Sequence, residues 1–209
     1  MTKSIFTALG LFALILGVSF LTPSLSNAAN KAIIGETAPD FSVLTTSGET
    51  FTLSEYKDKI VILEWTNHQC PFVRKHYDSN NMQDLQKELT DKGAVWVSIV
   101  SSAKGKQGHI TPGEANAITT DESAAPSFKI LDESGEIGKL FGAKTTPHMY
   151  VINAGGALAY NGAIDDDSSP YADRAKGANN YIRAAFNDLT NGNDVQVAET
   201  RPYGCSVKY

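Results

Sequence analysis

Two runs of apolar residues, each the length of one buried strand, constrain the fold of this chain more than any other feature. Residues 60–65 are apolar except for Glu64, and residues 94–100 are apolar except for one serine. Continuous rather than alternating apolar character is typical of strands that are covered on both faces. Between the runs, apolar residues recur at helical spacing, at Met82, Leu85 and Leu89. The chain is therefore predicted to form an α/β sheet with helices on both faces.

The remaining pattern continues this alternation. Alternating apolar residues on either side of Ser47-Gly48 predict an N-terminal hairpin. A helix that follows Pro71 is expected to be interrupted at residues 78–81, which are rich in helix-breaking and capping residues. Caps, turns and apolar spacing predict the later elements: a helix from Thr111, a strand at 128–131, a short helix at 136–141, paired strands at 148–152 and 157–160, and a helix at 181–189.

Residues 1–28 have the composition of a secretory signal peptide. Lys3 precedes a stretch from Ile5 to Leu21 that is almost wholly apolar, and Ser26-Asn27-Ala28 provides small residues for cleavage after Ala28. An uncleaved membrane anchor is the alternative, because the stretch is near the lower length limit for a span. We expect an exported, periplasmic protein without a membrane span after signal cleavage.

The chain is acidic, with 18 Lys and Arg against 23 Asp and Glu and a net charge of −5. Nucleic-acid binding requires a basic patch, so we expect no nucleic-acid partner. The length beyond the signal peptide suits one domain with a sizeable core. We predict a domain at residues 29–190, followed by a tail at residues 191–209 that carries Cys205. The sequence does not indicate an oligomeric state.

Cys70 is the candidate nucleophile. It follows the apolar run 60–65 and precedes the predicted helix, so it is expected beyond the carboxyl end of a strand, where sites lie in open α/β sheets. A helix N-terminus favours the thiolate, which is the reactive form of cysteine. The other cysteine of the chain is Cys205. In an oxidising compartment two cysteines can also form a lasting structural disulfide, and this alternative stays open.

The order of elements and three short motifs resemble the thioredoxin-fold superfamily, and within it the peroxiredoxin-like redoxins related to alkyl hydroperoxide reductase and thiol-specific antioxidant proteins. The motifs are Ala38-Pro39-Asp40-Phe41, Cys70-Pro71 and Thr145-Thr146-Pro147-His148. The resemblance covers residues 33–190. It implies a thioredoxin-like fold, a central mixed sheet with helices on both faces, and a thiol-dependent oxidoreductase. It also implies a cis peptide at Thr146–Pro147 facing Cys70.

Other positions depart from the patterns of these relatives. Val73 stands where a Cys-x-x-Cys motif has its second cysteine, so a local dithiol is impossible. Asn67 stands where peroxiredoxins have a hydroxyl residue, and Leu63 replaces their upstream proline. Arg74, one helical turn after Cys70, is either a group that stabilises the thiolate or a solvated surface charge.

By the same resemblance, Cys205 is the candidate resolving cysteine. Cys70 would attack a peroxide or a protein disulfide, Cys205 would close an internal disulfide, and a thiol donor would reduce it. No cofactor is expected for this cycle.

Two other functions remain open. One is copper or zinc binding, or a chaperone-like role, that uses Cys70 with nearby histidines, since thiolate and imidazole suit these metals; the candidates are His68, His76 and His148. The other is a non-catalytic domain in which Cys70 and Cys205 form a structural disulfide. The acidic run at residues 165–167 is a weaker candidate for a calcium site.

Overall fold

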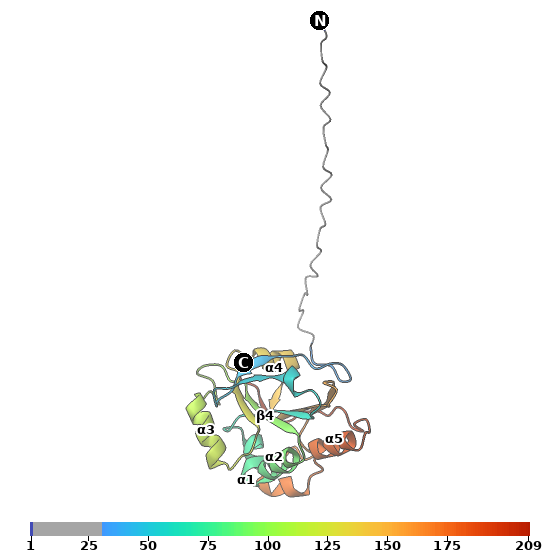
Figure 1. Ribbon diagram of the computed structural model, residues 1–209. Coiled ribbons are helices and arrows are strands. Elements are labelled where there is room, and N and C mark those ends of the chain that lie inside the picture. Colours follow the sequence, from blue (N-terminus) through green and yellow to red (C-terminus); the bar gives the residue numbers. More distant parts are fainter. Residues whose placement is uncertain (2–30) are drawn as a thin grey trace.

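The computed structural model describes residue 1 and residues 31–209, so the predicted signal peptide lies outside the described residues apart from Met1. A five-stranded mixed sheet in the order β5-β4-β3-β7-β8 forms the centre (Figure 1). Its strands are β3 (Val61–Trp65), β4 (Val95–Val100), β5 (Phe128–Leu131), β7 (His148–Ile152) and β8 (Leu158–Gly162). The strands β3, β4 and β5 are parallel to one another. The strand β7 pairs antiparallel with β3, and β8 pairs antiparallel with β7. The predicted mixed sheet is confirmed.

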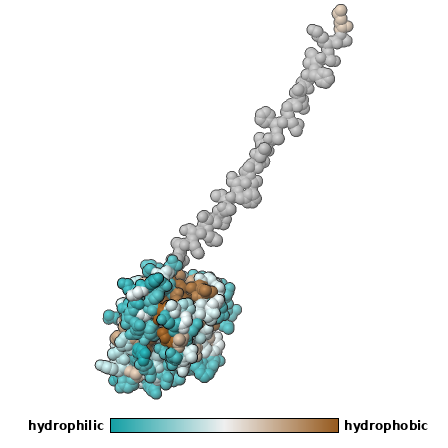
Figure 2. Space-filling view, turned by 90° about the vertical axis from the view of Figure 1, so that its left-hand side faces the viewer, coloured by the Kyte–Doolittle hydropathy of each residue, from teal (hydrophilic) through white to brown (hydrophobic). Residues whose placement is uncertain are grey.

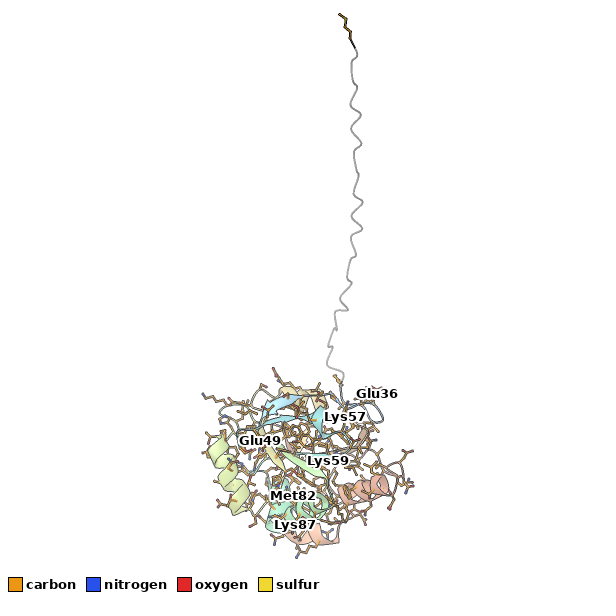
Figure 3. The ribbon with its side chains drawn as sticks, viewed as in Figure 1. Glu36, Glu49, Lys57, Lys59, Met82 and Lys87 are labelled. Carbon is orange, nitrogen blue, oxygen red and sulfur yellow. The ribbon has the colours of Figure 1, made fainter. Side chains whose placement is uncertain are left out.

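Helices cover both faces of this sheet. In Figure 1, α1 (Pro71–Asp78) and α2 (Asn81–Asp91) lie below it, and α4 (Glu136–Phe141) lies above. The lower core also receives α5 (Tyr181–Thr190), while α3 (Pro112–Asp121) lies at the side. Figure 3 shows α2 presenting Met82, which is fully buried, and Lys87, whose side chain is largely exposed. The predicted coverage of both faces is therefore observed.

The strands β3 and β4 are buried along their whole length, as their apolar sequences predicted. Each face of the sheet has its own hydrophobic core, and each core contains one fully buried tryptophan. Trp65 lies in the core between the sheet and α4, and Trp96 lies in the core between the sheet and the helices α1 and α2. Cys70 belongs to the core that contains Trp96. The site therefore lies on the α1 side of the sheet.

Glu64 is the polar exception in β3. Its carboxylate is fully buried and accepts four hydrogen bonds of 2.8–3.1 Å, from Tyr77 Oη, Gln86 Nε2, Trp96 Nε1 and Ser98 Oγ. Buried polar groups are costly unless they are hydrogen-bonded, and this one is bonded through both oxygens. Glu64 thus joins β3 to β4, α1 and α2.

Local sequence signals explain most of the element ends. The predicted capping box forms at α3, where Thr111 and Glu114 exchange hydrogen bonds. The helical segment after Pro71 is interrupted as expected, with Asn80 in the left-handed region at φ 59° between α1 and α2. The predicted strand at 157–160 instead spans Leu158–Gly162, because it continues along β7 as far as Met149.

The N-terminal hairpin forms a separate two-stranded sheet of β1 (Ser42–Leu44) and β2 (Thr50–Thr52), followed by the 3-10 helix η1 (Leu53–Tyr56). Its apolar side chains join the core beneath α4. Lys31, Phe41 and Leu140 line a cavity of about 510 Å³ there. Figure 2 shows an apolar surface where the described domain begins. This surface belongs to the face of the sheet opposite Cys70.

The tail (residues 191–209) packs on the domain and adds a two-stranded sheet that the sequence did not predict. Its strand β9 (Cys205–Ser206) pairs antiparallel with β6 (Thr145–Thr146), and Thr146 lies opposite Cys205. The 3-10 helix η2 (Ala172–Gly177), which was also not predicted, packs on α1. Among the described residues, no helix combines the length and apolar character needed to cross a membrane.

Candidate functional site

Cys70 caps the N-terminus of α1. It has extended backbone angles, Pro71 occupies the first helical position, and the Cys70 carbonyl accepts hydrogen bonds from the N–H groups of Val73 and Arg74 at 3.0 and 2.9 Å. Proline suits this position because its missing N–H would have no helical partner there. The Cys70 side chain is fully buried. The local sequence therefore places its sulfur at the positive end of a helix, as predicted.

Cys205 lies directly against Cys70. Their Sγ atoms are 2.6 Å apart, and both cysteines are free. The Cys70 Sγ also lies 3.1 Å from the carbonyl oxygen of Thr146. The pairing of β6 with β9 produces this approach, because it sets Cys205 beside Thr146. Cys70 is buried, whereas Cys205 is partly exposed.

Opposing effects act on the pKa of Cys70. Burial raises it, but hydrogen bonds from the side chains of Cys205 and Thr146 and from the N–H groups of Cys205 and Val73 lower it by more, so the net pKa is below the usual value. The pKa of Cys205 is raised to about 11, by burial and by the adjacent Cys70. Of the two thiols, Cys70 is therefore the one that loses its proton more readily.

The Thr146–Pro147 peptide bond is cis, as the resemblance implied. It brings the β6 backbone to Cys70. The hydroxyl of Thr146 is buried and has no other hydrogen-bond partner among the described residues. This hydroxyl is therefore available to donate to the Cys70 sulfur.

Asn67 and His148 hold the structure around the site. The Asn67 side chain accepts from the N–H of Gln69 and donates to the carbonyl of Gln107, so it fastens the loop before Cys70. His148 Nδ1 accepts from the N–H of Lys144, and its Nε2 donates to Asn161 Oδ1 at 2.8 Å. Both ring nitrogens of His148 are thus engaged away from Cys70. Burial lowers the pKa of His148 to about 4.

The side chains of Arg74 and His68 also make no hydrogen bond to the Cys70 sulfur. The Arg74 guanidinium is exposed and pairs with Asp78 at 2.8 Å, one helical turn onward. His68 is partly buried, and burial lowers its pKa. The surface-charge interpretation of Arg74 therefore describes the observed geometry.

A buried polar cluster anchors the tail at Tyr203, two residues before Cys205. The Tyr203 hydroxyl donates to Asp165 Oδ1 and lies 3.1 Å from His76 Nε2. The buried Lys75 ammonium lies 5.3 Å from the centre of the Tyr203 ring. The sequence does not predict this cluster. Its only signal is the presence of Tyr203 and Tyr209 in an otherwise polar tail, which indicates that the tail packs on the domain. Burial lowers the pKa of His76 to about 3.

The metal alternatives find little support in this geometry. Within residues 31–209, no group of three or more His, Cys, Asp and Glu side chains is arranged to hold a metal ion. In the acidic run, Asp165 bonds Tyr203, Asp166 bonds Asn179, and Asp167 pairs with Arg174. Asp165 and Asp167 also converge on the buried Lys75 ammonium, at 3.7 and 3.6 Å, so a cation of the protein itself already lies between them.

The sheet order, the Cys70 position and the cis proline define a thioredoxin-like redoxin. Residues 34–161 match the family model described as the AhpC/TSA family. Because this match spans more than half of the chain, the chain belongs to the AhpC/TSA family. It is also 32% identical to the thioredoxin-like protein YneN of Bacillus subtilis over 124 residues, which are 59% of this chain and 68% of YneN.

Solved structures show the same fold. An uncharacterized conserved protein from Geobacillus kaustophilus aligns with a TM-score of 0.73 and 24% identity, over 86% of this chain and 94% of its own. A hypothetical protein from Sinorhizobium meliloti aligns with a TM-score of 0.72 and 25% identity, over 86% and 96%. A candidate thiol:disulfide interchange protein DsbE from Chlorobium tepidum aligns with a TM-score of 0.51 and 23% identity, over 63% and 85%. The fold of this chain is thus shared with all three structures.

Proposed function

We propose that this protein is a thiol-dependent oxidoreductase that reduces a peroxide or a disulfide, with Cys70 as the nucleophile and Cys205 as the resolving cysteine. The observation that carries the proposal is the contact between the two thiols, 2.6 Å apart although they lie 135 positions apart in sequence. The lowered pKa of Cys70 supports its role, because the thiolate is the attacking species.

The cycle with a hydroperoxide has three steps. The Cys70 thiolate attacks the terminal oxygen of the peroxide; an S–O bond forms, the O–O bond breaks, and the leaving alkoxide takes a proton. Cys205 then loses its proton and attacks the sulfur of the Cys70 sulfenic acid, which releases water and forms the Cys70–Cys205 disulfide. Two molecules of a thiol donor restore both cysteines and leave as a disulfide. With a disulfide substrate, the leaving groups are two thiolates.

A structural disulfide is the second candidate, because the same proximity permits a bond that never turns over. The feature that favours the catalytic role is the site around Cys70, where the helix N-terminus and hydrogen-bond donors favour the thiolate. A purely structural bridge does not need this environment.

We also propose that the protein acts after export, as a single domain with a tail that carries Cys205. The support is the signal-peptide composition of residues 1–28. An exported redoxin works in an oxidising compartment, so its disulfide must be reduced by a dedicated thiol donor rather than by the cytosolic thiol pool.

Titration of the fully reduced protein with one equivalent of hydrogen peroxide tests the cycle. The wild type should lose two hydrogens in intact-mass measurements and both thiols should disappear together. The variant C205S should accumulate a sulfenic acid at Cys70 that dimedone traps. The variant C70S should show neither the loss of two hydrogens nor a dimedone adduct. After dithiothreitol reduction, a second addition of peroxide should give the same result. Wild-type protein that keeps both thiols after peroxide and after a small disulfide would exclude the proposed function.

A further inference from the structure

The tail occupies the edge of β6 beside Cys70. This edge is two residues long, and among the described residues β9 is the only strand that pairs with it. An open strand edge is a template for an added extended chain. The paired tail shows what such a chain must do to bring a sulfur to Cys70: it must lie antiparallel to β6 with its cysteine opposite Thr146. A protein disulfide that approaches as an extended chain therefore needs the place that the tail already fills.

The fit at Gly204 is too tight for any side chain. Its φ is +128°, and a Cβ at this position would overlap the carbonyl oxygen of Thr146. Only glycine adopts this backbone conformation without strain. The residue before the cysteine is thus specified by close backbone approach, and other residues cannot replace it without moving the strand.

Tyr203 fixes the same segment from the other side. Its hydroxyl contacts the buried residues His76 and Asp165, and its ring lies over the buried Lys75. Further along, the Val207 N–H donates to the Lys144 carbonyl at 3.1 Å. These contacts lie on both sides of Cys205. The segment is a bound strand, fastened at both ends.

We infer that residues 203–206 are a built-in occupant of the β6 edge and restrict the oxidant to small molecules such as hydroperoxides, with Tyr203 as the positioning residue. A protein disulfide requires displacement of the whole segment. A small oxidant requires movement only of Cys205, the partly exposed residue that covers the Cys70 sulfur. The inference rests on the proposed function and names the substrate class within it.

The test compares two oxidants on the fully reduced full-length protein. Oxidation by hydrogen peroxide and by the disulfides of insulin is followed by quenching and mass measurement. In the variant G204A the added Cβ should push β9 away from β6. Its rate with insulin should rise at least about tenfold over wild type, the factor that corresponds to ~1.4 kcal/mol of lost docking. The control G113A, where a Cβ meets nothing within 4 Å, should leave both rates unchanged.

A second pair of variants covers the case in which G204A does not fold. Y203F removes the contacts with His76 and Asp165, and should also raise the insulin rate. Its matched control, Y209F, removes a hydrogen bond to the Ala143 carbonyl away from the thiols, and should raise the rate less. The midpoint potential of the Cys70–Cys205 couple should shift in Y203F and not in Y209F.

Wild-type protein that reacts with insulin as fast as the foldable variants would overturn the inference, since the tail would then exclude nothing. Equal effects of Y203F and Y209F on the potential would reduce Tyr203 to a general docking contact and overturn its positioning role. Neither result alters the proposed function, which fails only if the reduced wild type forms no internal disulfide with any oxidant.

Discussion

The environment of the Cys70 sulfur combines burial with hydrogen-bond donors. A fully buried thiol would ordinarily have a raised pKa, because a low-dielectric surrounding disfavours the charged form. Here the N–H groups of Cys205 and Val73, the Cys205 thiol and the Thr146 hydroxyl act against that effect. The Thr146 hydroxyl has no other partner among the described residues, so its removal disturbs nothing else. It is therefore the residue whose contribution can be measured most cleanly.

We predict that T146V raises the pKa of Cys70, because it removes a hydrogen-bond donor that favours the thiolate. The thiolate fraction at neutral pH should fall with it. The measurement is the ultraviolet absorbance of the thiolate against pH in a C205S background, so that one thiol titrates. The neighbouring Thr145 hydroxyl donates to the Pro147 carbonyl, and T145V is the control. Identical titrations of T146V and T145V would contradict the assignment.

At the scale of elements, β3 is held by polar bonds as well as by apolar packing. Glu64 accepts hydrogen bonds from groups on β4, α1 and α2, all of them buried. Removing one partner from a buried network leaves the others unsatisfied, and that cost exceeds the net value of the bonds themselves. The strand that delivers Cys70 therefore depends on a single carboxylate.

We predict that E64Q lowers the free energy of unfolding by about 1–3 kcal/mol, because the amide nitrogen of glutamine would face donors that now bond a carboxylate oxygen. The matched control is E36Q, which should change stability by less than about 0.5 kcal/mol, as is usual on the surface. Figure 3 shows Glu36 at the periphery, and it is exposed. Urea unfolding at neutral pH measures both variants. Equal changes in the free energy of unfolding for E64Q and E36Q would show that the buried hydrogen bonds of Glu64 do not stabilise the fold.

Elements with a strong local signal were predictable from the sequence, and those defined by tertiary contact were not. The continuous apolar runs specified β3 and β4, and the capping box specified the start of α3. By contrast, β9 has two residues and no periodicity, and it exists because β6 offers an edge. The thiol of Cys70 could be identified from its position after a strand. The anchor of Tyr203 could not, since its partners come from α1 and from the acidic run at residues 165–167.

At the scale of the whole molecule, two histidines are buried in neutral form. Burial lowers the pKa of His148 to about 4 and that of His76 to about 3, against about 6.5 in an unfolded chain. Below about pH 6.5 the unfolded state binds more protons than the folded state at these positions, so their effect is to reduce stability as pH falls. Above about pH 6.5 both histidines are neutral in the folded and the unfolded state, so they no longer reduce the free energy of unfolding.

We predict that the folded domain loses stability between about pH 6.5 and pH 4, and that His148 accounts for about 2 kcal/mol of the loss by about pH 5. In H148Q, the difference in unfolding free energy between about pH 7 and pH 5 should shrink by that amount, even though the variant is less stable at both. Urea unfolding across this range gives the values. A pH slope in H148Q equal to that of the wild type would show that folding does not lower the pKa of His148.

The placement of the two tryptophans has a practical consequence. Trp65 and Trp96 lie on adjacent strands but on opposite faces of the sheet, and their indole N–H groups donate to different partners, Ser101 and Glu64. Each hydrophobic core thus carries its own intrinsic fluorophore. Replacing either one leaves the emission of the other to report on a single face. Coincident unfolding transitions in the two single-tryptophan proteins would show that the cores melt as one cooperative unit, and separated transitions would reveal an intermediate.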